Sequence, residues 1–137
     1  MNREIKFRGK GIADNEWYYG DLIQVESGRV HYFIIQDYEI KEDRIELNTC
    51  ASPEVIPETI GQYTGLKDKN GKEIWENDIV EITRECIYEQ GIIVLKNGCF
   101  FIKTKENLLA LYNCELNNYK VKVIGNITDN PELLGGE

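Results

Sequence analysis

The 137-residue chain has few of the side chains that carry most enzyme chemistry. It contains one histidine, His31, and two serines, Ser27 and Ser52, and neither serine stands in the turn of a nucleophile elbow. His31 has no cysteine or carboxylate at nucleophile spacing, so a hydrogen-bonded structural role is favoured over a general base. No glycine-rich segment has the spacing and the following lysine-serine pair of a phosphate-binding loop. We therefore expect no enzyme activity.

Cysteine is also scarce, and its spacing argues against a metal site. The four cysteines form no C-x-x-C pair, whereas a zinc site normally takes two of its ligands from one short turn. Reduced and mostly buried thiols are therefore favoured, and no metal is expected. The four are Cys50, Cys86, Cys99 and Cys114.

Four carboxylates that lie close together in the sequence are the remaining candidates for binding a divalent ion. Alternate residues of a strand point to opposite faces, so these side chains would have to converge from different directions. A charged, solvated strand edge is therefore favoured over a metal site, and we expect no cofactor. The four are Glu73, Glu76, Asp78 and Glu81.

Long apolar runs are missing as well. No stretch approaches the length of roughly 20 apolar residues that a membrane-spanning helix needs. The first residues, Met-Asn-Arg-Glu-Ile-Lys, lack the apolar core of a signal peptide. We expect a cytoplasmic protein with no membrane partner.

What the chain has in excess is negative charge, with 24 acidic against 16 basic residues and a formal net charge of −8. Nonspecific affinity for DNA or RNA comes from lysine and arginine, so this excess argues against a protein that coats nucleic acid. Through residue 58 there are 12 acidic against 7 basic residues, so the negative charge is concentrated in the first half. Any nucleic-acid contact would more easily use the C-terminal half.

The chain is rich in β-branched and aromatic residues, which favours strands over helices. Its length suits one compact domain or two small β subdomains, and roughly two thirds of the unfolded surface can then be buried. Residues 60–82 organise the chain, because three turn signals and three short apolar runs are packed into this segment. Pro53 and Pro57 favour an extended connection just before it, and we place the subdomain boundary there.

Three corners that contain asparagine define the strand order around this segment. Asn70-Gly71 and Asn97-Gly98 each predict a two-residue type I′ turn, because both residues of such a pair tolerate a positive φ angle. Between them, Asn77 can adopt the left-handed conformation while Asp78 bonds back to nearby amides. The corner at Asn77-Asp78 starts a new strand at an abrupt angle, as in a small barrel.

Three strands are predicted early in the chain. Residues 3–8 alternate polar with apolar, which places Ile5 and Phe7 inward and the charged residues, including Arg8, outward. Residues 16–23 return as the second arm of a hairpin, and their aromatic side chains are favoured as core. Residues 29–36 are largely apolar on both faces, which predicts a central strand.

The second half alternates more regularly. Strands are predicted over residues 79–84, 90–96, 99–103 and 119–127, with 105–112 as a strand or a single turn. So many short strands in so short a segment suit a small SH3-like barrel. The predicted fold is therefore mainly β, and α+β at most. It has an N-terminal β-hairpin or sheet subdomain over residues 1–58 and a C-terminal SH3-like β-barrel subdomain over residues 59–137.

Five segments spread over nearly the whole chain carry a family resemblance. They are Phe7-Arg-Gly-Lys, Glu16-Trp-Tyr-Tyr-Gly-Asp-Leu-Ile, residues 60–82, Val123-Ile-Gly-Asn-Ile and Asn130-Pro-Glu-Leu-Leu. Together they resemble the YopX family of small bacteriophage and prophage proteins, which usually has glycine where this chain has Asn77. The resemblance implies a mostly β, two-part fold with an SH3-like C-terminal portion. It also implies a phage or prophage accessory role in a bacterial cell, and it supplies no reaction.

A binding module that acts through protein or nucleic-acid contacts is the favoured function. Small SH3-like barrels use aromatic-lined grooves and open edges to hold peptides or nucleic acid. Trp75, Tyr63, Lys69 and Lys72 lie on or near the hairpin of the organising segment and are our candidate binding residues. The alternative for Trp75 and Tyr63 is that they fill the interface between the two halves, and their exposure decides between these readings.

Two other functions stay open. A chain with several edge strands could act as a homo-oligomer whose copies cover one another's edges. The acidic surface could instead imitate DNA and occupy a host enzyme, which predicts carboxylates in a continuous exposed stripe. The sequence does not identify the partner in any of these cases.

Overall fold

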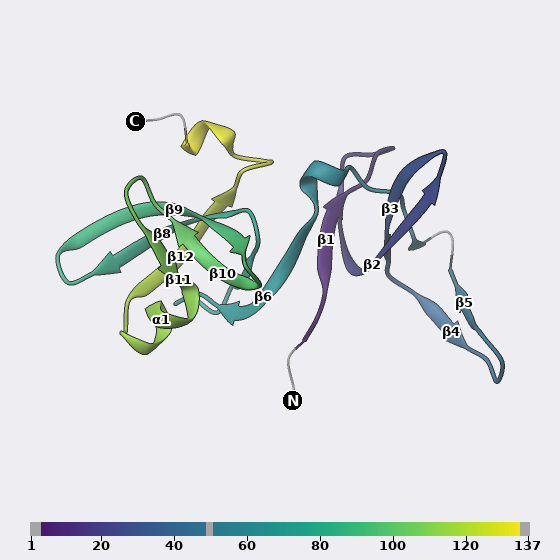
Figure 1. The fold of residues 1–137 in the computed structure, drawn as a ribbon, viewed down its shortest axis with the longest axis horizontal. Helices are drawn as coiled ribbons and strands as arrows, with labels where there is room; N and C mark the ends of the chain where they lie inside the picture. Colours follow the sequence, from purple (N-terminus) through teal and green to yellow (C-terminus); the bar gives the residue numbers. More distant parts are fainter. Residues whose placement is uncertain (1–3, 49–50, 135–137) are drawn as a thin grey trace. The chain divides into compact units, whose positions relative to one another are not determined.

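The computed structural model describes residues 4–48 and 51–134. The chain divides into two compact units, Met1–Tyr63 and Thr64–Glu137, and each is described by itself below (Figure 1). We predicted this boundary after residue 58. Over the described residues the fold is mainly β, with two five-stranded antiparallel sheets and one two-stranded hairpin. No helix in this part of the chain is long and apolar enough to cross a membrane.

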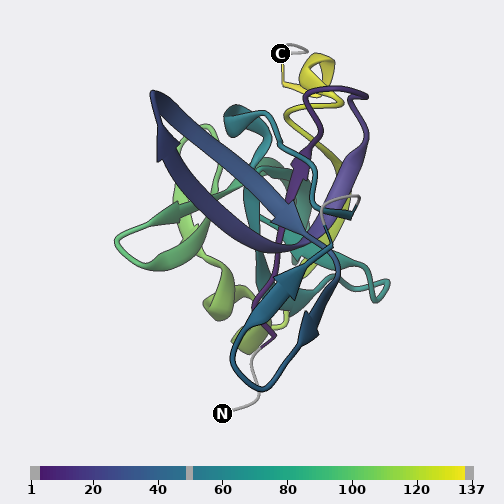
Figure 2. The same ribbon diagram turned by 90° about the vertical axis from the view of Figure 1, so that its right-hand side faces the viewer.

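The first unit begins with three consecutive antiparallel strands. Its β2–β3 hairpin is long and curved (Figure 2) and turns at Gly28, whose φ angle of 76° is one that glycine adopts without steric cost. The 3-10 helix η2 (Pro57–Thr59) then leads into β6 (Gly61–Lys67), whose first two residues pair with β1. The three early strands are β1 (Phe7–Lys10), β2 (Trp17–Ser27) and β3 (Arg29–Ile35).

Two expectations for this unit were wrong. β3 lies at the edge of its sheet, in the order β3-β2-β1-β6-β7, and not at its centre. Ile5 is exposed and Arg8 is buried, which reverses the predicted inward and outward positions of these two residues. The guanidinium carbon of Arg8 lies 4.7 Å from the centroid of the Trp17 ring, so the buried cation has a favourable aromatic partner.

The second unit contains the sheet β11-β10-β9-β8-β12. The strands predicted over residues 79–84, 90–96, 99–103 and 119–127 are confirmed, and the segment 105–112 holds both β11 and the start of a helix. The elements are β7 (Glu73–Trp75), β8 (Asp78–Arg84), β9 (Ile87–Lys96), β10 (Cys99–Lys103), β11 (Leu108–Ala110), α1 (Leu111–Leu116), β12 (Lys120–Asn126) and the 3-10 helix η3 (Pro131–Leu133).

The sheet of the second unit is open, so the predicted SH3-like barrel is wrong. No sheet formed by the described residues closes into a barrel. Helix α1 packs against both β11 and β12, the two edge strands, and buries Leu111 and Cys114 in the core. Because the helix lies against both edges, these strands do not pair with each other, and barrel closure requires that they do.

Two of the predicted corners are confirmed. Asn97 and Gly98 have φ angles of 52° and 80°, as a type I′ turn requires. Asn77 has a φ angle of 75°, and the carboxylate of Asp78 accepts a hydrogen bond of 2.8 Å from the backbone N–H of Trp75. The left-handed asparagine and the bonded aspartate together turn β7 into β8.

The third corner is not the predicted type I′ turn. Gly71 has a positive φ angle of 82°, but Asn70 does not have one. The backbone N–H of Gly71 donates to the carbonyl of Asp68, and the N–H of Asp68 donates to the carbonyl of Lys72. The loop is therefore longer than two residues. It begins at Asp68, whose backbone bonds to both Gly71 and Lys72.

Candidate functional site

Asp68 is the buried anchor of the turn between β6 and β7. The residue is 8% exposed, and its Oδ1 accepts hydrogen bonds from the N–H groups of Asn70 and Lys72, at 2.8 Å and 2.9 Å. Its Oδ2 accepts a bond of 2.9 Å from the N–H of Val123. Burial acts to raise the pKa of Asp68, but these three donors and the nearby Lys72 charge together hold the pKa below its usual value.

The same turn is bound to the outer edge of β12. Besides the bond from Val123 to Asp68, the N–H of Lys69 donates to the carbonyl of Val121 at 3.0 Å. β12 is the last strand of its sheet, so these groups would otherwise face outward without a partner strand. The turn therefore covers part of this edge and places its own lysines beside those of β12.

The exposed lysines of this turn and of β12 form what we call the lysine surface. Val121 and Val123 are buried, so the alternate residues Lys120 and Lys122 point away from the core. All members of the surface are exposed, and among the described residues none of them forms an ion pair. The lysine surface consists of Lys69, Lys72, Lys120 and Lys122.

A carboxylate that could neutralise this surface is engaged elsewhere. Glu81 lies opposite Lys122 in the β8–β12 ladder, but its side chain accepts a hydrogen bond from the hydroxyl of Tyr88. This hydrogen bond raises the pKa of Tyr88, because only the protonated hydroxyl can donate it, and burial and the negative charge of Glu81 act in the same direction. Within the described part of the chain, Glu81 forms no ion pair with Lys122, so the ammonium group of Lys122 stays exposed without a carboxylate partner.

The two aromatic residues of our candidate site are buried. Trp75 is 4% exposed, at the end of β7 in the second unit, and Tyr63 is 6% exposed, at the end of the first unit. Neither ring therefore offers an open platform, whereas Lys69 and Lys72 are exposed. Binding by these four residues stays a prediction. Of the four, only Lys69 and Lys72 have the exposure that contact with a partner requires.

Cations of the first unit have partners within that unit. The ammonium group of Lys6 lies 5.1 Å from the centroid of the Tyr63 ring, and that of Lys10 lies 5.5 Å from the centroid of Trp17. Lys6 also pairs with Glu4 at 3.4 Å. These ammonium groups are therefore held against an aromatic ring or a carboxylate of their own unit.

His31 has a carboxylate partner that sequence spacing did not reveal. Its Nδ1 lies 2.8 Å from Oε2 of Glu54, and Arg29 approaches the same oxygen at 3.4 Å. Glu54 is brought there by an isolated bridge with Phe33, which lies two positions after His31 on β3. The contact confirms the predicted hydrogen-bonded histidine, and Glu54 is the residue that sequence analysis missed.

The hairpin of β4 (Tyr38–Ile40) and β5 (Ile45–Leu47) has one apolar and one charged face. Tyr38 pairs with Leu47, and Ile40 pairs with Ile45, so these four side chains share one face. All four are exposed, Ile40 to 75%. Both ribbon views show the hairpin extending away from the other strands of the first unit (Figures 1 and 2).

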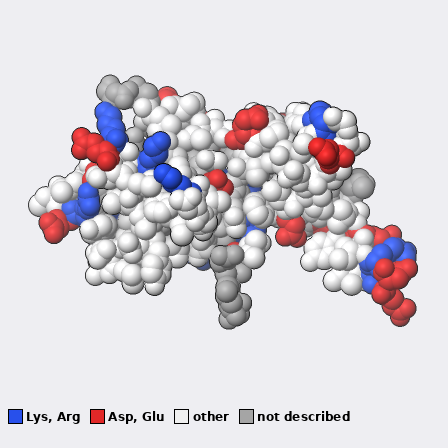
Figure 3. Space-filling view, viewed as in Figure 1, with Lys and Arg blue, Asp and Glu red and all other residues white. Residues whose placement is uncertain are grey.

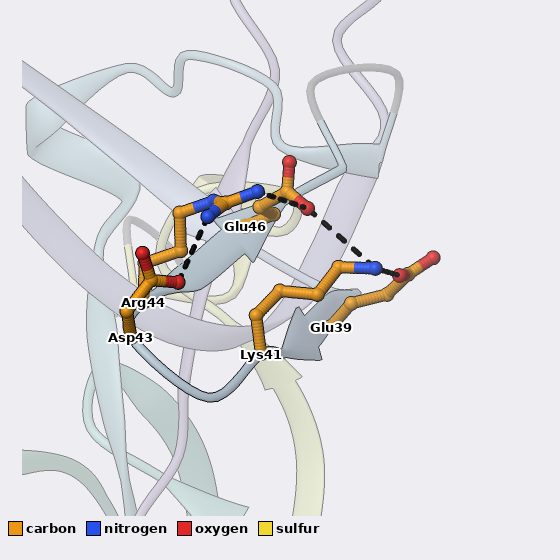
Figure 4. A network of polar contacts seen from close by, with 5 residues as sticks. All are labelled: Glu39, Lys41, Asp43, Arg44 and Glu46. Carbon is orange, nitrogen blue, oxygen red and sulfur yellow. Dashed lines mark hydrogen bonds and ion pairs between the residues drawn. The ribbon is translucent and has the colours of Figure 1, made fainter.

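Ion pairs cover the charged part of this hairpin (Figure 4). Lys41 contacts Glu39 at 2.8 Å and Glu46 at 3.7 Å, while Arg44 contacts Asp43 at 2.8 Å. Figure 3 shows this group as adjoining blue and red side chains at the lower right. The charges neutralise one another locally, which leaves the apolar face as the distinctive surface of the hairpin.

The second unit also carries an open groove of about 810 Å³. It is lined by the first half of β9, by the turn that follows β10 and by residues at the end of η3. The lining is mixed: the groove contains the apolar Leu133 and Leu134 and the charged Lys103 and Glu106. None of the predicted site residues lies in it.

Cysteines and carboxylates give no metal site over residues 4–48 and 51–134, where no group of three or more possible ligands converges. Cys114 is a buried thiol whose pKa is raised by burial, but Cys86 and Cys99 are exposed, contrary to our expectation of mostly buried thiols. Cys50 lies outside the described residues. Asp78 is 2% exposed and bonds to the Trp75 amide, so it is not part of a solvated strand edge.

Comparison with protein families gives a match over nearly the whole chain. The sequence profile described as YopX protein matches residues 6–135. The chain belongs to the YopX family. No curated protein matches it.

One solved structure gives a similar fold for this YopX family protein. It is protein EF1440 from Enterococcus faecalis, with 27% sequence identity and a TM-score of 0.65. The match covers 97% of this chain and 99% of the other. The name of that protein indicates no ligand or activity.

Half of the lysine surface was missed by sequence analysis. Lys69 and Lys72 were chosen because they flank a turn, whereas Lys120 and Lys122 were seen only as polar positions of a strand. Their signal was present in the alternation Lys-Val-Lys-Val, which places both lysines on one face. What the sequence did not show is the contact between this strand and the turn.

Proposed function

We propose that this YopX family protein is a non-enzymatic binding module that contacts nucleic acid through its lysine surface. The observation that carries the proposal is the juxtaposition of Lys69 and Lys72 with Lys120 and Lys122, all exposed and without ion pairs within the described part of the chain. Lysine acts as a flexible point charge toward phosphate. The phage or prophage accessory role implied by the family resemblance is part of the same proposal.

The charge distribution supports contact with the phosphate backbone over reading of bases. Trp75 and Tyr63 are buried, so they supply no ring for base stacking. The net charge of −8 repels a polyanion from most directions, which favours a modest affinity restricted to the lysine surface. Binding of this kind weakens steeply as salt increases.

The test is fluorescence anisotropy of labelled mixed-sequence DNA and RNA at low and moderate salt. We expect Lys122→Glu to weaken binding by about tenfold at low salt, because it removes one phosphate contact and adds a repulsive charge. The matched control is Lys96→Glu, which makes the same charge change at an exposed lysine of β9 outside the surface. Equal losses in both variants would contradict the proposal, and binding only to an acidic protein would assign the surface to another partner class.

Imitation of DNA has less support. Carboxylates on the face drawn in Figure 3 occur in separate groups, several of them beside lysine or arginine. A DNA mimic needs a continuous negative stripe.

Self-assembly is a second candidate, favoured by the hairpin of β4 and β5. Its exposed apolar face carries no charge, so two copies can meet face to face without burying an unpaired ion. Light scattering over a range of concentrations tests this. We expect any dimer to be lost in Ile40→Lys and kept in Glu42→Lys, which places the new lysine in the tip of the hairpin. A monomer at all concentrations would exclude self-assembly.

A further inference from the structure

β9 is longer than both strands that flank it, and this leaves part of its backbone without a partner strand. It pairs with β8 over residues 87–92 and with β10 over residues 92–96. β10 ends at Lys103 because Thr104 and Asn107 form a tight turn. The N–H of Thr104 donates to the Asn107 carbonyl at 2.9 Å, and the N–H of Asn107 donates to Thr104 Oγ1 at 3.0 Å. The β10 side of residues 87–91 is therefore an open edge.

The alternation of an antiparallel ladder identifies the open groups. A two-residue turn joins β8 to β9, which makes Ile87 a hydrogen-bonded position, and the same holds for every second residue after it. Ile87, Glu89 and Gly91 thus point their N–H and C=O groups toward β8. Tyr88 and Gln90 point theirs to the open side, and over the described residues neither has a backbone hydrogen bond to a loop or turn.

This open edge is part of the lining of the 810 Å³ groove. Tyr88 and Gln90 are themselves exposed, and both line the groove. Leu133 and Leu134 line the same groove, and Leu134 is exposed. The groove thus combines unpaired backbone groups with an apolar contact surface.

We propose that the groove binds an extended peptide segment of another protein, which adds to β9 at Tyr88 and Gln90 as a short antiparallel strand in line with β10. Two backbone positions that face one way and are separated by one residue match the repeat of a peptide strand. Apolar side chains of the segment contact Leu133 and Leu134. The site shares no residue with the lysine surface and goes beyond the proposed function.

The test compares two substitutions at Gln90 that differ in the backbone group. Gln90→Pro removes the N–H that faces the groove and leaves the ladder with β8 intact, because proline is tolerated where a strand edge needs no donor. Gln90→Ala removes the side chain and keeps that N–H. The probe is a labelled, capped peptide of about nine residues that alternates threonine with valine and ends in two lysines. The control probe has proline at the valine positions.

We expect the strand-forming peptide to bind the wild type and Gln90→Ala with affinities within about twofold, and Gln90→Pro at least about tenfold more weakly. The control peptide should bind none of them. Equal binding by Gln90→Pro and Gln90→Ala overturns the proposal, as does equal binding of the two peptides. Self-association that is lost in Gln90→Pro would assign the edge to a second copy and overturn the peptide assignment.

Amide hydrogen exchange of the wild type keeps the proposal testable if Gln90→Pro fails to fold. In the free protein, the amides of Tyr88 and Gln90 should exchange quickly while those of Ile87, Glu89 and Gly91 are protected. Saturation with the strand-forming peptide should slow exchange at Tyr88 and Gln90. Unchanged exchange at these two amides overturns the proposal.

Discussion

The two units of the chain use their positive charges in different ways. In the first unit, every described lysine and arginine has an ion pair or lies over an aromatic ring. In the second unit, the lysine surface has no ion pair among the described residues. A net charge of −8 therefore does not show where an anionic partner can bind, because local pairing decides which cations are available. The cations of the first unit are Lys6, Arg8, Lys10, Arg29, Lys41 and Arg44.

The largest effect should come from Asp68→Ala, which removes the buried acceptor that holds the lysine surface together. Three backbone donors lose their partner, two in the turn and one on β12. We expect the free energy of unfolding, measured in urea, to fall by about 3 kcal/mol, since hydrogen bonds to charged groups are each worth about 1.5–3 kcal/mol and are not additive. Exposed Glu132→Ala is the control and should change it by less than about 0.5 kcal/mol.

Nucleic-acid binding should fall with stability in Asp68→Ala, because Lys69 and Lys72 lose their position beside β12. Binding that stays at the wild-type level in a folded Asp68→Ala protein would show that the turn does not have to be anchored. The second unit would then bind through charge alone.

Acid should weaken the second unit through the same residue. The pKa of Asp68 is lower in the folded protein than its unfolded value of about 3.9, so its stabilisation is complete above that value and is lost as pH falls through the folded pKa. The difference in unfolding free energy between wild type and Asp68→Asn should therefore shrink below about pH 4. A difference that stays constant down to acid unfolding would refute this role of the carboxylate.

A smaller effect on stability should distinguish a buried cation that stacks on an aromatic ring from an exposed cation of the lysine surface. Arg8→Met removes a buried guanidinium that stacks on Trp17 and should destabilise the protein by about 1–2 kcal/mol. Lys122→Met makes the same kind of change at an exposed lysine and should cost less than about 0.5 kcal/mol. Thermal or urea unfolding measures both. Equal costs would remove the contrast between the two units.

Local features of the fold could be read from the sequence where one or two residues determine them. Asn77 and Asn97 adopt positive φ angles as predicted, because this conformation depends mainly on the residue itself. Asn70 does not, since the carboxylate of Asp68 two positions earlier bonds to the turn and selects another loop. The strands of the second unit were also predictable, because alternation alone identifies them.

Features that depend on distant contacts could not be read in this way. Closure of the barrel fails because Leu111 and Cys114 turn a segment with mixed signals into a helix that packs against both sheet edges. Only half of the lysine surface was predicted, since its assembly depends on a hydrogen bond between Asp68 and Val123, 55 positions apart. The open edge of β9 likewise follows from where β10 ends, which no local pattern marks.

The most direct test of the difference between the units is a pair of double charge reversals measured by anisotropy with the same labelled DNA. Lys69→Glu with Lys122→Glu changes the lysine surface, and Lys41→Glu with Arg44→Glu makes an equal change of charge on the hairpin of the first unit. We predict that the first pair abolishes detectable binding at low salt and that the second lowers affinity by no more than about threefold. Equal losses in the two double variants, or a larger loss in the second, would contradict the account.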